Sequence, residues 1–108
     1  MDKKQVESMF NELIDMERRI FSSKGDDYTN DDSDRLANFK RNAKLTGMTS
    51  GQVWSIYFMK HIDAILTYIR TGKLSSEGLI GRINDARNYL VLLACLFQEA
   101  QDEASKHE

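Results

Sequence analysis

The sequence predicts an all-α protein, a four-helix bundle of three long helices and one short one, which we expect to oligomerise. The 108 residues contain no proline, so helices can run without interruption. Apolar residues recur at the three- and four-residue spacing of amphipathic helices, and no segment alternates like a half-buried strand. The length fits a single domain over residues 1–108. Because a domain this small buries only about 60–70% of its unfolded surface, self-association would add stability.

The first half of the chain predicts a long helix, a loop and a short helix. An apolar stripe predicts the long helix over about residues 3–22, and Gly25 is expected to end it in the left-handed conformation. The stripe consists of Val6, Met9, Phe10, Leu13, Ile14 and Ile20. An aspartate-rich loop is expected over about residues 23–32, and a short helix over about 33–46, ended by Gly47.

The second half predicts two long helices. Thr49 and Gln52 have the spacing of a capping box, which predicts a helix start, and "RTGK" predicts its end near residue 71. This helix is apolar on most sides, so it should lie centrally in the core or in a subunit interface. The last helix should begin near Ser75 or Ser76 and run to about residue 104.

Composition limits the classes of partner. The net charge is -2 and the pI about 5.7, without the basic surface typical of a nucleic-acid-binding protein. No apolar run is long enough for a transmembrane helix, and the first ten residues lead into no signal sequence, so we expect no membrane partner. The single cysteine, Cys95, lies in the apolar run "YLVLLACLF", which predicts a buried, inert thiol in a reducing cytoplasm.

Polar residues interrupt the most apolar helix at "YFMKHIDAI". In one interpretation Lys60, His61 and Asp63 form the solvent-exposed face of this helix, with an ion pair between Lys60 and Asp63. In the other they line a pocket, where Lys60 meets a phosphate and Asp63 meets a metal or a ribose hydroxyl. His61 is either a polar residue at the edge of the core or a ligand-binding residue.

A second polar group lies in "EGLIGRINDARNYL". Asp85 and Asn88 precede a fully apolar run, so they should sit at the edge of the core, where a carboxylate needs a partner or a cation. A structural Arg82–Asp85 pair is the alternative. Gly78 and Gly81 are costly in a helix, which suggests the close approach of another helix or of a ligand.

The third group is the stretch "SKGDDYTNDDSDRLANFKRNAK". Its aspartates are typical of a solvated loop. Alternatively, the stretch is the lip of a nucleotide pocket, in which Lys24 meets a phosphate, Tyr28 stacks on a base and Asn38 contacts a base edge or a ribose. The chain has no Walker loop, Rossmann glycine pattern, zinc-ligand spacing or EF-hand loop.

The order of these motifs resembles a known family. "KGDDY", "LANFK", "VW", "KHIDAI" and "GRINDARNYL", spread over about residues 20–98, resemble small phage-type proteins described as nucleotide-modification-associated or MazG-like domains. They belong to the all-α nucleoside triphosphate pyrophosphohydrolase superfamily. The resemblance implies a dimer or tetramer, Mg²⁺ held by helix carboxylates, and cleavage of a nucleoside triphosphate to monophosphate and pyrophosphate. A phage-encoded protein would act in the host cytoplasm.

The resemblance implies a set of site residues. Asp63 and Asp85 would be catalytic, and with Glu77 they would hold the metal; Glu12 of "ELID" is a further candidate. The substrate-binding residues would be Lys24, Asp27, Tyr28, Asn38, Phe39, Lys60, His61, Arg82, Asn88 and Tyr89. Where MazG enzymes carry "ExxE" and "ExxD", this chain has "KHID" with one carboxylate, and Glu77 and Asp85 stand eight residues apart.

Three functions remain open from the sequence. The first is a Mg²⁺-dependent nucleoside triphosphate pyrophosphohydrolase. The second is a non-catalytic protein on the same fold that sequesters a nucleotide, such as a signalling nucleotide of host defence. The third is an oligomeric scaffold without a ligand.

Overall fold

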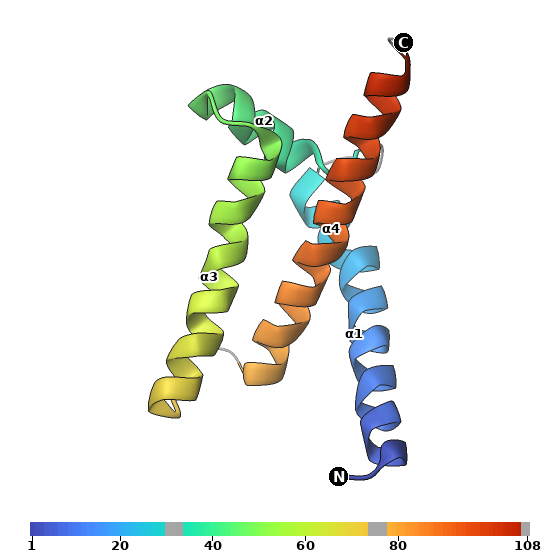
Figure 1. The fold of residues 1–108 in the computed structure, drawn as a ribbon, viewed down its shortest axis with the longest axis vertical. Coiled ribbons are helices and arrows are strands. Elements are labelled where there is room, and N and C mark those ends of the chain that lie inside the picture. Colours follow the sequence, from blue (N-terminus) through green and yellow to red (C-terminus); the bar gives the residue numbers. More distant parts are fainter. Residues whose placement is uncertain (30–33, 74–77, 107–108) are drawn as a thin grey trace. The chain divides into compact units, whose positions relative to one another are not determined.

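The chain forms four helices in a computed structural model, shown in Figure 1. They are α1 (Lys3–Thr29), α2 (Ala37–Thr46), α3 (Ser50–Thr71) and α4 (Leu79–Lys106). The structure describes residues 1–29, 34–73 and 78–106, and only the backbone of residues 23–29. Within these ranges there is no strand, so the predicted all-α class, with three long helices and one short one, is confirmed.

The helices divide between two compact units, and each is described by itself. The first unit, Met1–Arg35, contains α1, and the second, Leu36–Glu108, contains the other three helices.

The first unit is a single long helix. Its start is capped by a reciprocal pair of hydrogen bonds, in which the Gln5 amide donates to Asp2 Oδ1 and the Asp2 amide donates to Gln5 Oε1. The helix passes through Gly25 and ends at Thr29, so the predicted end at Gly25 and the predicted loop over residues 23–29 were wrong. A glycine inside a helix costs only about 1 kcal/mol relative to alanine, which does not by itself end one. The rest of the predicted loop, residues 30–32, lies outside the described residues.

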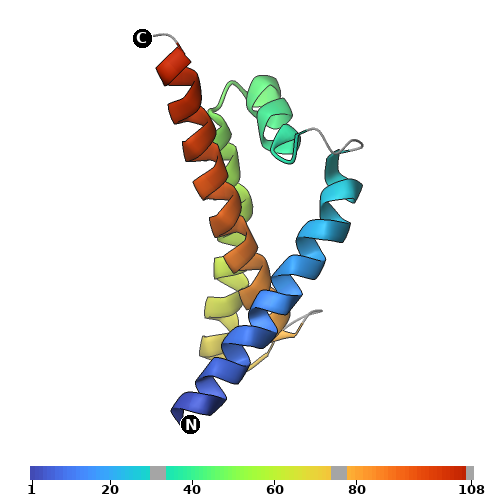
Figure 2. The ribbon, with the colours of Figure 1, turned by 90° about the vertical axis from the view of Figure 1, so that its right-hand side faces the viewer.

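The second unit is built on an antiparallel pair of helices. Figures 1 and 2 show α3 and α4 running side by side in opposite directions, with α2 packed near the first half of α3. The core lies where the three meet, around the buried side chains of Leu36, Phe39, Val53 and Trp54. Partly buried side chains complete it: Ala43, Met48, Tyr57, Phe58, Tyr89, Leu92, Leu93 and Leu96.

Local signals set both ends of α3. Thr49 Oγ1 accepts from the Gln52 amide and Gln52 Oε1 accepts from the Thr49 amide, which confirms the predicted capping box. Gly72 ends the helix with φ 72°, and Gly47 ends α2 with φ 71°, conformations that glycine adopts without strain. Helix α2 begins at Ala37 rather than near residue 33. The predicted cap of α4, Ser75 or Ser76, lies outside the described residues.

Packing overturns one burial prediction. Cys95 is exposed, not buried, because its neighbours Leu92 and Leu96 turn toward the core while Cys95 lies on another face of α4. Helix α3 contributes Val53 and Trp54 to the core, while its apolar residues Ile56, Met59, Leu66 and Ile69 are 47–71% exposed. The other interpretation of α3, a helix in a subunit interface, is taken up below.

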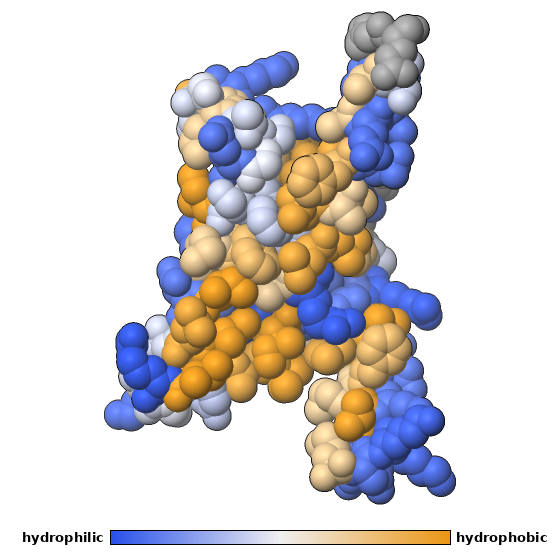
Figure 3. Space-filling model, in the orientation of Figure 1, coloured by the Kyte–Doolittle hydropathy of each residue, from blue (hydrophilic) through white to orange (hydrophobic). Residues whose placement is uncertain are grey.

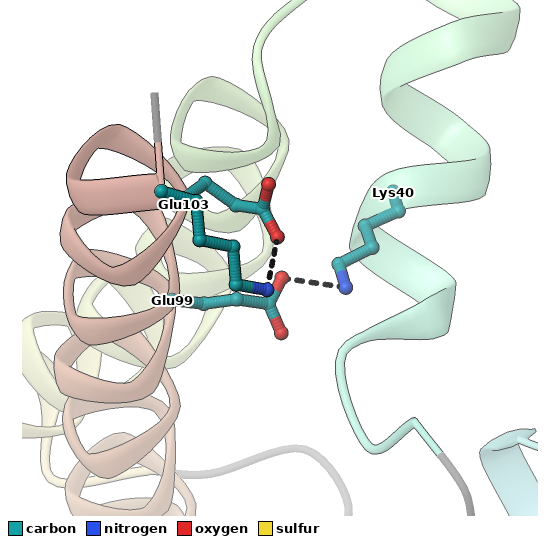
Figure 4. Close-up of polar contacts among 4 residues, drawn as sticks. Lys40, Glu99 and Glu103 are labelled. Carbon is teal, nitrogen blue, oxygen red and sulfur yellow. Dashed lines mark hydrogen bonds and ion pairs between the residues drawn. The ribbon is translucent and has the colours of Figure 1, made fainter. Parts of the chain in front are cut away.

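An ion pair links α2 to the last helix. Figure 4 shows Lys40 of α2 reaching Glu99 of α4, with 2.6 Å between Nζ and Oε1. Lys106 pairs with Glu103 within α4 at 3.4 Å. Because Lys40 and Glu99 are 37% and 45% exposed, solvent screening keeps the contribution of this pair below about 1 kcal/mol. None of the helices, over the residues that the structure describes, has the length and hydropathy needed to cross a membrane.

The capping box gives a testable stability prediction. Thr49→Ala removes the acceptor for the Gln52 amide at the start of α3, and should lower the free energy of unfolding by about 1 kcal/mol. Urea denaturation followed by circular dichroism measures the change. Ser55→Ala, at an exposed position of the same helix, is the control and should be close to neutral. An equal loss in both variants would contradict a specific role for the cap.

Candidate functional site

Trp54 fixes the register of α3 against α4. Its indole Nε1 donates a hydrogen bond to the Tyr89 carbonyl oxygen at 2.6 Å, and its ring stacks on Phe58 with centroids 4.7 Å apart. The side chain is 8% exposed, so an indole N–H without this acceptor would be costly. His61 lies seven residues after Trp54, two turns along the same face, and therefore also faces α4.

His61 meets three side chains of α4. Its Nδ1 lies 3.3 Å from Arg82 Nη1 and 3.8 Å from Asp85 Oδ2, and its ring centroid lies 5.0 Å from that of Tyr89. We call these four residues the histidine cluster: His61, Arg82, Asp85 and Tyr89. The side chains of His61 and Asp85 are 15% and 14% exposed, so the cluster is largely shielded but still reaches solvent.

The contacts of His61 define its hydrogen-bonding state. A guanidinium has only donors, so a hydrogen bond from Arg82 Nη1 requires His61 Nδ1 to accept. The imidazole proton then resides on Nε2. Nδ1 also lies 3.8 Å from Oδ2 of the Asp85 carboxylate.

Aromatic rings extend the cluster toward α2. The Phe39 ring lies 6.1 Å from the Tyr57 ring and 6.2 Å from the Tyr89 ring, so it joins α3 to α4. Lys60 Nζ lies over the Tyr57 ring, 5.4 Å from its centroid, which is within cation–π range. Asn42 Nδ2 donates to Tyr57 Oη at 3.3 Å, which ties the end of this aromatic row to α2.

Two buried asparagines lie one turn apart on α4. Asn84 is fully buried and Asn88 is 4% exposed. Both side-chain polar atoms of Asn88, Nδ2 and Oδ1, have no hydrogen-bond partner among the residues that the structure describes. A buried polar group without a hydrogen bond lowers the folding stability by about 1–3 kcal/mol. Asn88 therefore destabilises the fold unless another group forms hydrogen bonds with it. It follows Asp85 by three residues and is therefore its neighbour on the helix surface.

The predicted substrate-binding residues do not all lie at the same place in the structure. Lys60, His61, Arg82 and Tyr89 lie in or beside the histidine cluster. The amide oxygen of Asn38 already accepts from Arg41 and Asn42. Phe39 is 4% exposed, so its ring fills the core rather than a pocket surface. Three further predicted residues lie in the backbone-only part of α1, where side chains are not described: Lys24, Asp27 and Tyr28.

The predicted metal ligands are not brought together. Asp85 belongs to the histidine cluster, whereas Asp63 is exposed and lies two residues from His61, a separation that turns two side chains to different faces. Lys60 contacts Tyr57, and the structure gives no ion pair between Lys60 and Asp63. Glu77 lies outside the described residues, and Glu12 is exposed on α1. Among the residues described, no three His, Cys, Asp or Glu side chains are grouped as metal ligands.

The glycines at the start of α4 border open space. A Cβ atom built on Gly78 or Gly81 would meet no other atom within 4 Å. Within the second unit no other helix approaches these glycines closely, and the approach of a ligand stays a prediction. Gly81 precedes Asp85 by one turn, so space without a side chain adjoins the cluster.

Sequence reasoning missed the burial of Asn84 and the bond from Trp54 to the Tyr89 carbonyl. The four-residue spacing of Asn84 and Asn88 beside an apolar run was the available signal for a buried polar stripe. The Trp54 bond had no such signal, because its acceptor is a backbone atom 35 residues away.

Comparison with known proteins gives no identification. No protein-family model matches the chain, and no curated protein or solved structure is significantly similar to it.

The hydrogen-bonding state of His61 can be measured. If Arg82 donates to Nδ1, the neutral His61 ring should carry its proton on Nε2. Long-range ¹H–¹⁵N spectra distinguish the two neutral forms by their ring nitrogen shifts. Replacing Arg82 by Gln should redistribute the proton between the two nitrogens. A proton on Nδ1 in the unaltered protein would contradict the arrangement.

Proposed function

We propose that the chain binds a nucleotide at the histidine cluster and, with Mg²⁺, cleaves a nucleoside triphosphate to monophosphate and pyrophosphate. The observation that supports this most is the contact of His61 with Arg82, Asp85 and Tyr89 across the α3–α4 interface. Cationic, acidic and aromatic groups from two helices meet there at a partly exposed position. The resemblance of "KHIDAI" and "GRINDARNYL" to MazG-like proteins concerns these same residues.

The cations of the site suit phosphate groups. Arg82 presents a planar guanidinium whose paired donors match phosphate oxygens. Lys60 is exposed and adjacent in sequence to His61, so its ammonium can move from the Tyr57 ring to a bound phosphate. These groups would hold and orient a triphosphate chain.

Asp85 is the residue of the cluster that would hold Mg²⁺. Proteins commonly bind Mg²⁺ through one or two carboxylates, with substrate phosphates and water completing the shell, so a single aspartate beside a phosphate site fits this mode. When bound, the ion would polarise the phosphoryl group and activate water. Arg82 and His61 flank the carboxylate and would hold it in position.

The aromatic groups suit a nucleoside. Tyr89 is partly buried and lies against His61, and Tyr57 lies under Lys60. Aromatic faces of this kind stack on bases. The predicted roles of Tyr28 as a base-stacking residue and of Glu77 as a metal ligand stay predictions of the sequence and carry no part of this site.

A second candidate function is nucleotide sequestration without cleavage. It is favoured by the charges of the site, because Arg82 and Lys60 are cations and the one carboxylate of the histidine cluster, Asp85, contacts His61. Such a group suits a phosphate anion even without a metal ion. If the protein only sequesters a nucleotide, Lys60→Ala should weaken nucleotide binding, and this binding should not depend on Mg²⁺.

The finer architecture that we propose is a four-helix bundle that assembles into a dimer or tetramer. The apolar stripe of α1 is half exposed at Val6 and Phe10, at 55% and 53%, and an isolated helix is marginal in water. Figure 3 shows apolar side chains gathered over the lower halves of α3 and α4. Exposed members on these helices are Ile56, Met59, Leu66, Ile69, Ile80, Leu90, Val91 and Phe97. A surface this apolar is typical of an interface, and a second copy would cover it.

The function has a direct test. The purified protein is mixed with a pool of nucleoside triphosphates and cyclic signalling nucleotides, with and without Mg²⁺, and filtered. Mass spectrometry then identifies nucleotides in the free fraction and in the heat-denatured protein. We expect one triphosphate to become monophosphate and pyrophosphate only with Mg²⁺. A nucleotide recovered intact from the protein would instead establish sequestration, and no change in either fraction would contradict both functions.

The Asp85→Asn variant tests whether the activity belongs to the histidine cluster. Loss of the carboxylate should reduce turnover by at least about 10–100-fold, the range seen even for groups that only support metal ligands. Circular dichroism should show an intact fold, since asparagine keeps the size of the side chain. The matched control is Asp102→Asn, at an exposed position of the same helix, which should leave turnover unchanged. Unchanged turnover in Asp85→Asn would remove Asp85 from the site.

Self-association is tested at the apolar face. Leu66→Glu should shift the protein toward monomer, because an unpaired carboxylate buried in an interface costs several kcal/mol. Light scattering after size-exclusion chromatography measures the mass. Thr67→Glu adds the same charge at the neighbouring exposed position and serves as the control. A monomeric unaltered protein at high micromolar concentration would contradict the proposed assembly.

A further inference from the structure

Asn88 presents an unused pair of hydrogen-bonding groups beside the histidine cluster. Its Nδ2 and Oδ1 have no hydrogen-bond partner among the described residues, although the residue is only 4% exposed. Buried polar groups in proteins are nearly always hydrogen-bonded, so an amide with both ends unused points to a partner outside this part of the chain.

Open space lies two turns from Asn88, on the same stripe of α4. Asp85 precedes Asn88 by three residues and Gly81 by seven, so the three lie along this stripe. A Cβ atom at Gly81 would have no described atom within 4 Å beyond its chain neighbours and the nearby backbone of its own helix. A ligand held by Asp85 and Arg82 could therefore lie along this stripe. Because both polar atoms of Asn88 are buried, the side chains covering them must move when a ligand binds.

The chemistry of the Asn88 amide indicates which part of the ligand it would contact. An amide is neutral, so it offers little to a phosphate or a metal ion compared with Arg82 or Asp85. It presents one donor beside one acceptor, which matches a nucleobase edge that pairs an acceptor with a donor, as in the two-bond contact of asparagine with adenine. Guanine offers such a pair as well, O6 beside N1–H, and among the four bases it also presents two adjacent donors, N1–H and its amino group, which suit a carboxylate better than an amide.

We propose that Asn88 selects the base of the bound nucleotide by a two-bond contact with its donor–acceptor edge. This inference rests on the proposed nucleotide-binding function and adds the residue that sets its specificity. The phosphates lie on Arg82 and Lys60, the base on Asn88, and Tyr89 adjoins both through its contact with His61.

The test exchanges the amide for a carboxylate. Asn88→Asp keeps the shape but replaces the donor by a second acceptor, so the variant should favour guanine over the other three bases more strongly than the unaltered protein does. Competition binding with the triphosphates of adenosine, cytidine, guanosine and uridine, without Mg²⁺ to prevent turnover, measures the preference. We expect the affinity for guanine relative to the other three bases to rise by about tenfold or more. Gln98→Glu makes the same chemical change at an exposed position of α4 and should leave the preference unaltered.

A second variant keeps the test decisive if Asn88→Asp does not fold. Asn88→Ala removes both groups and should bring the four affinities to within a few-fold of one another, while circular dichroism reports the fold. Unchanged base preference in Asn88→Ala, with nucleotide still bound, would overturn the inference and leave the proposed function standing. An unaltered protein that binds none of the triphosphates would overturn both.

Discussion

The bond between the Trp54 indole and the Tyr89 carbonyl is the contact on which the site depends. Two packed helices can slide by a turn and still bury apolar residues, but a buried indole N–H tolerates few acceptors. This bond selects one register, and His61 then faces Arg82 and Asp85. The aromatic row through Phe39 gives α2 the same register, because its ring contacts both Tyr57 and Tyr89. The packing that stabilises the second unit thus also assembles its polar cluster.

The histidine cluster brings charged and polar groups of α3 and α4 together at a largely shielded position. A carboxylate 14% exposed, a guanidinium and an imidazole could satisfy one another and remain inert. The unused amide of Asn88 beside them argues against a purely structural network, because such networks are favourable when every member is satisfied. An anionic ligand with hydrogen-bonding edges would use both the cations and the amide. This is the physical basis for placing a nucleotide here.

The sequence predicted what local chemistry decides. The bounds of α3 follow from a capping box and a terminal glycine, both of which act within a few residues. The end of α1 was missed because the penalty for Gly25 is small against the stability of a long helix. His61, Arg82 and Asp85, which the resemblance assigns to one site, contact one another through His61, whereas Asp63, assigned with them, lies on another face of α3. Burial was harder to predict than the helix bounds. Asn88 is buried and Cys95 is exposed because of the face that α4 turns toward α3, and only tertiary packing determines that face.

One measurement tests the central claim, that the α3–α4 contact at His61 is where a nucleotide binds. Two-dimensional ¹H–¹⁵N spectra of the labelled protein are recorded while non-hydrolysable triphosphate analogues of the four bases are added. The account predicts that one analogue shifts the amides around His61 and from Arg82 to Tyr89, together with the Trp54 indole signal. Shifts confined to α1 or to the exposed ends of the helices, with these signals unmoved at saturation, would contradict it.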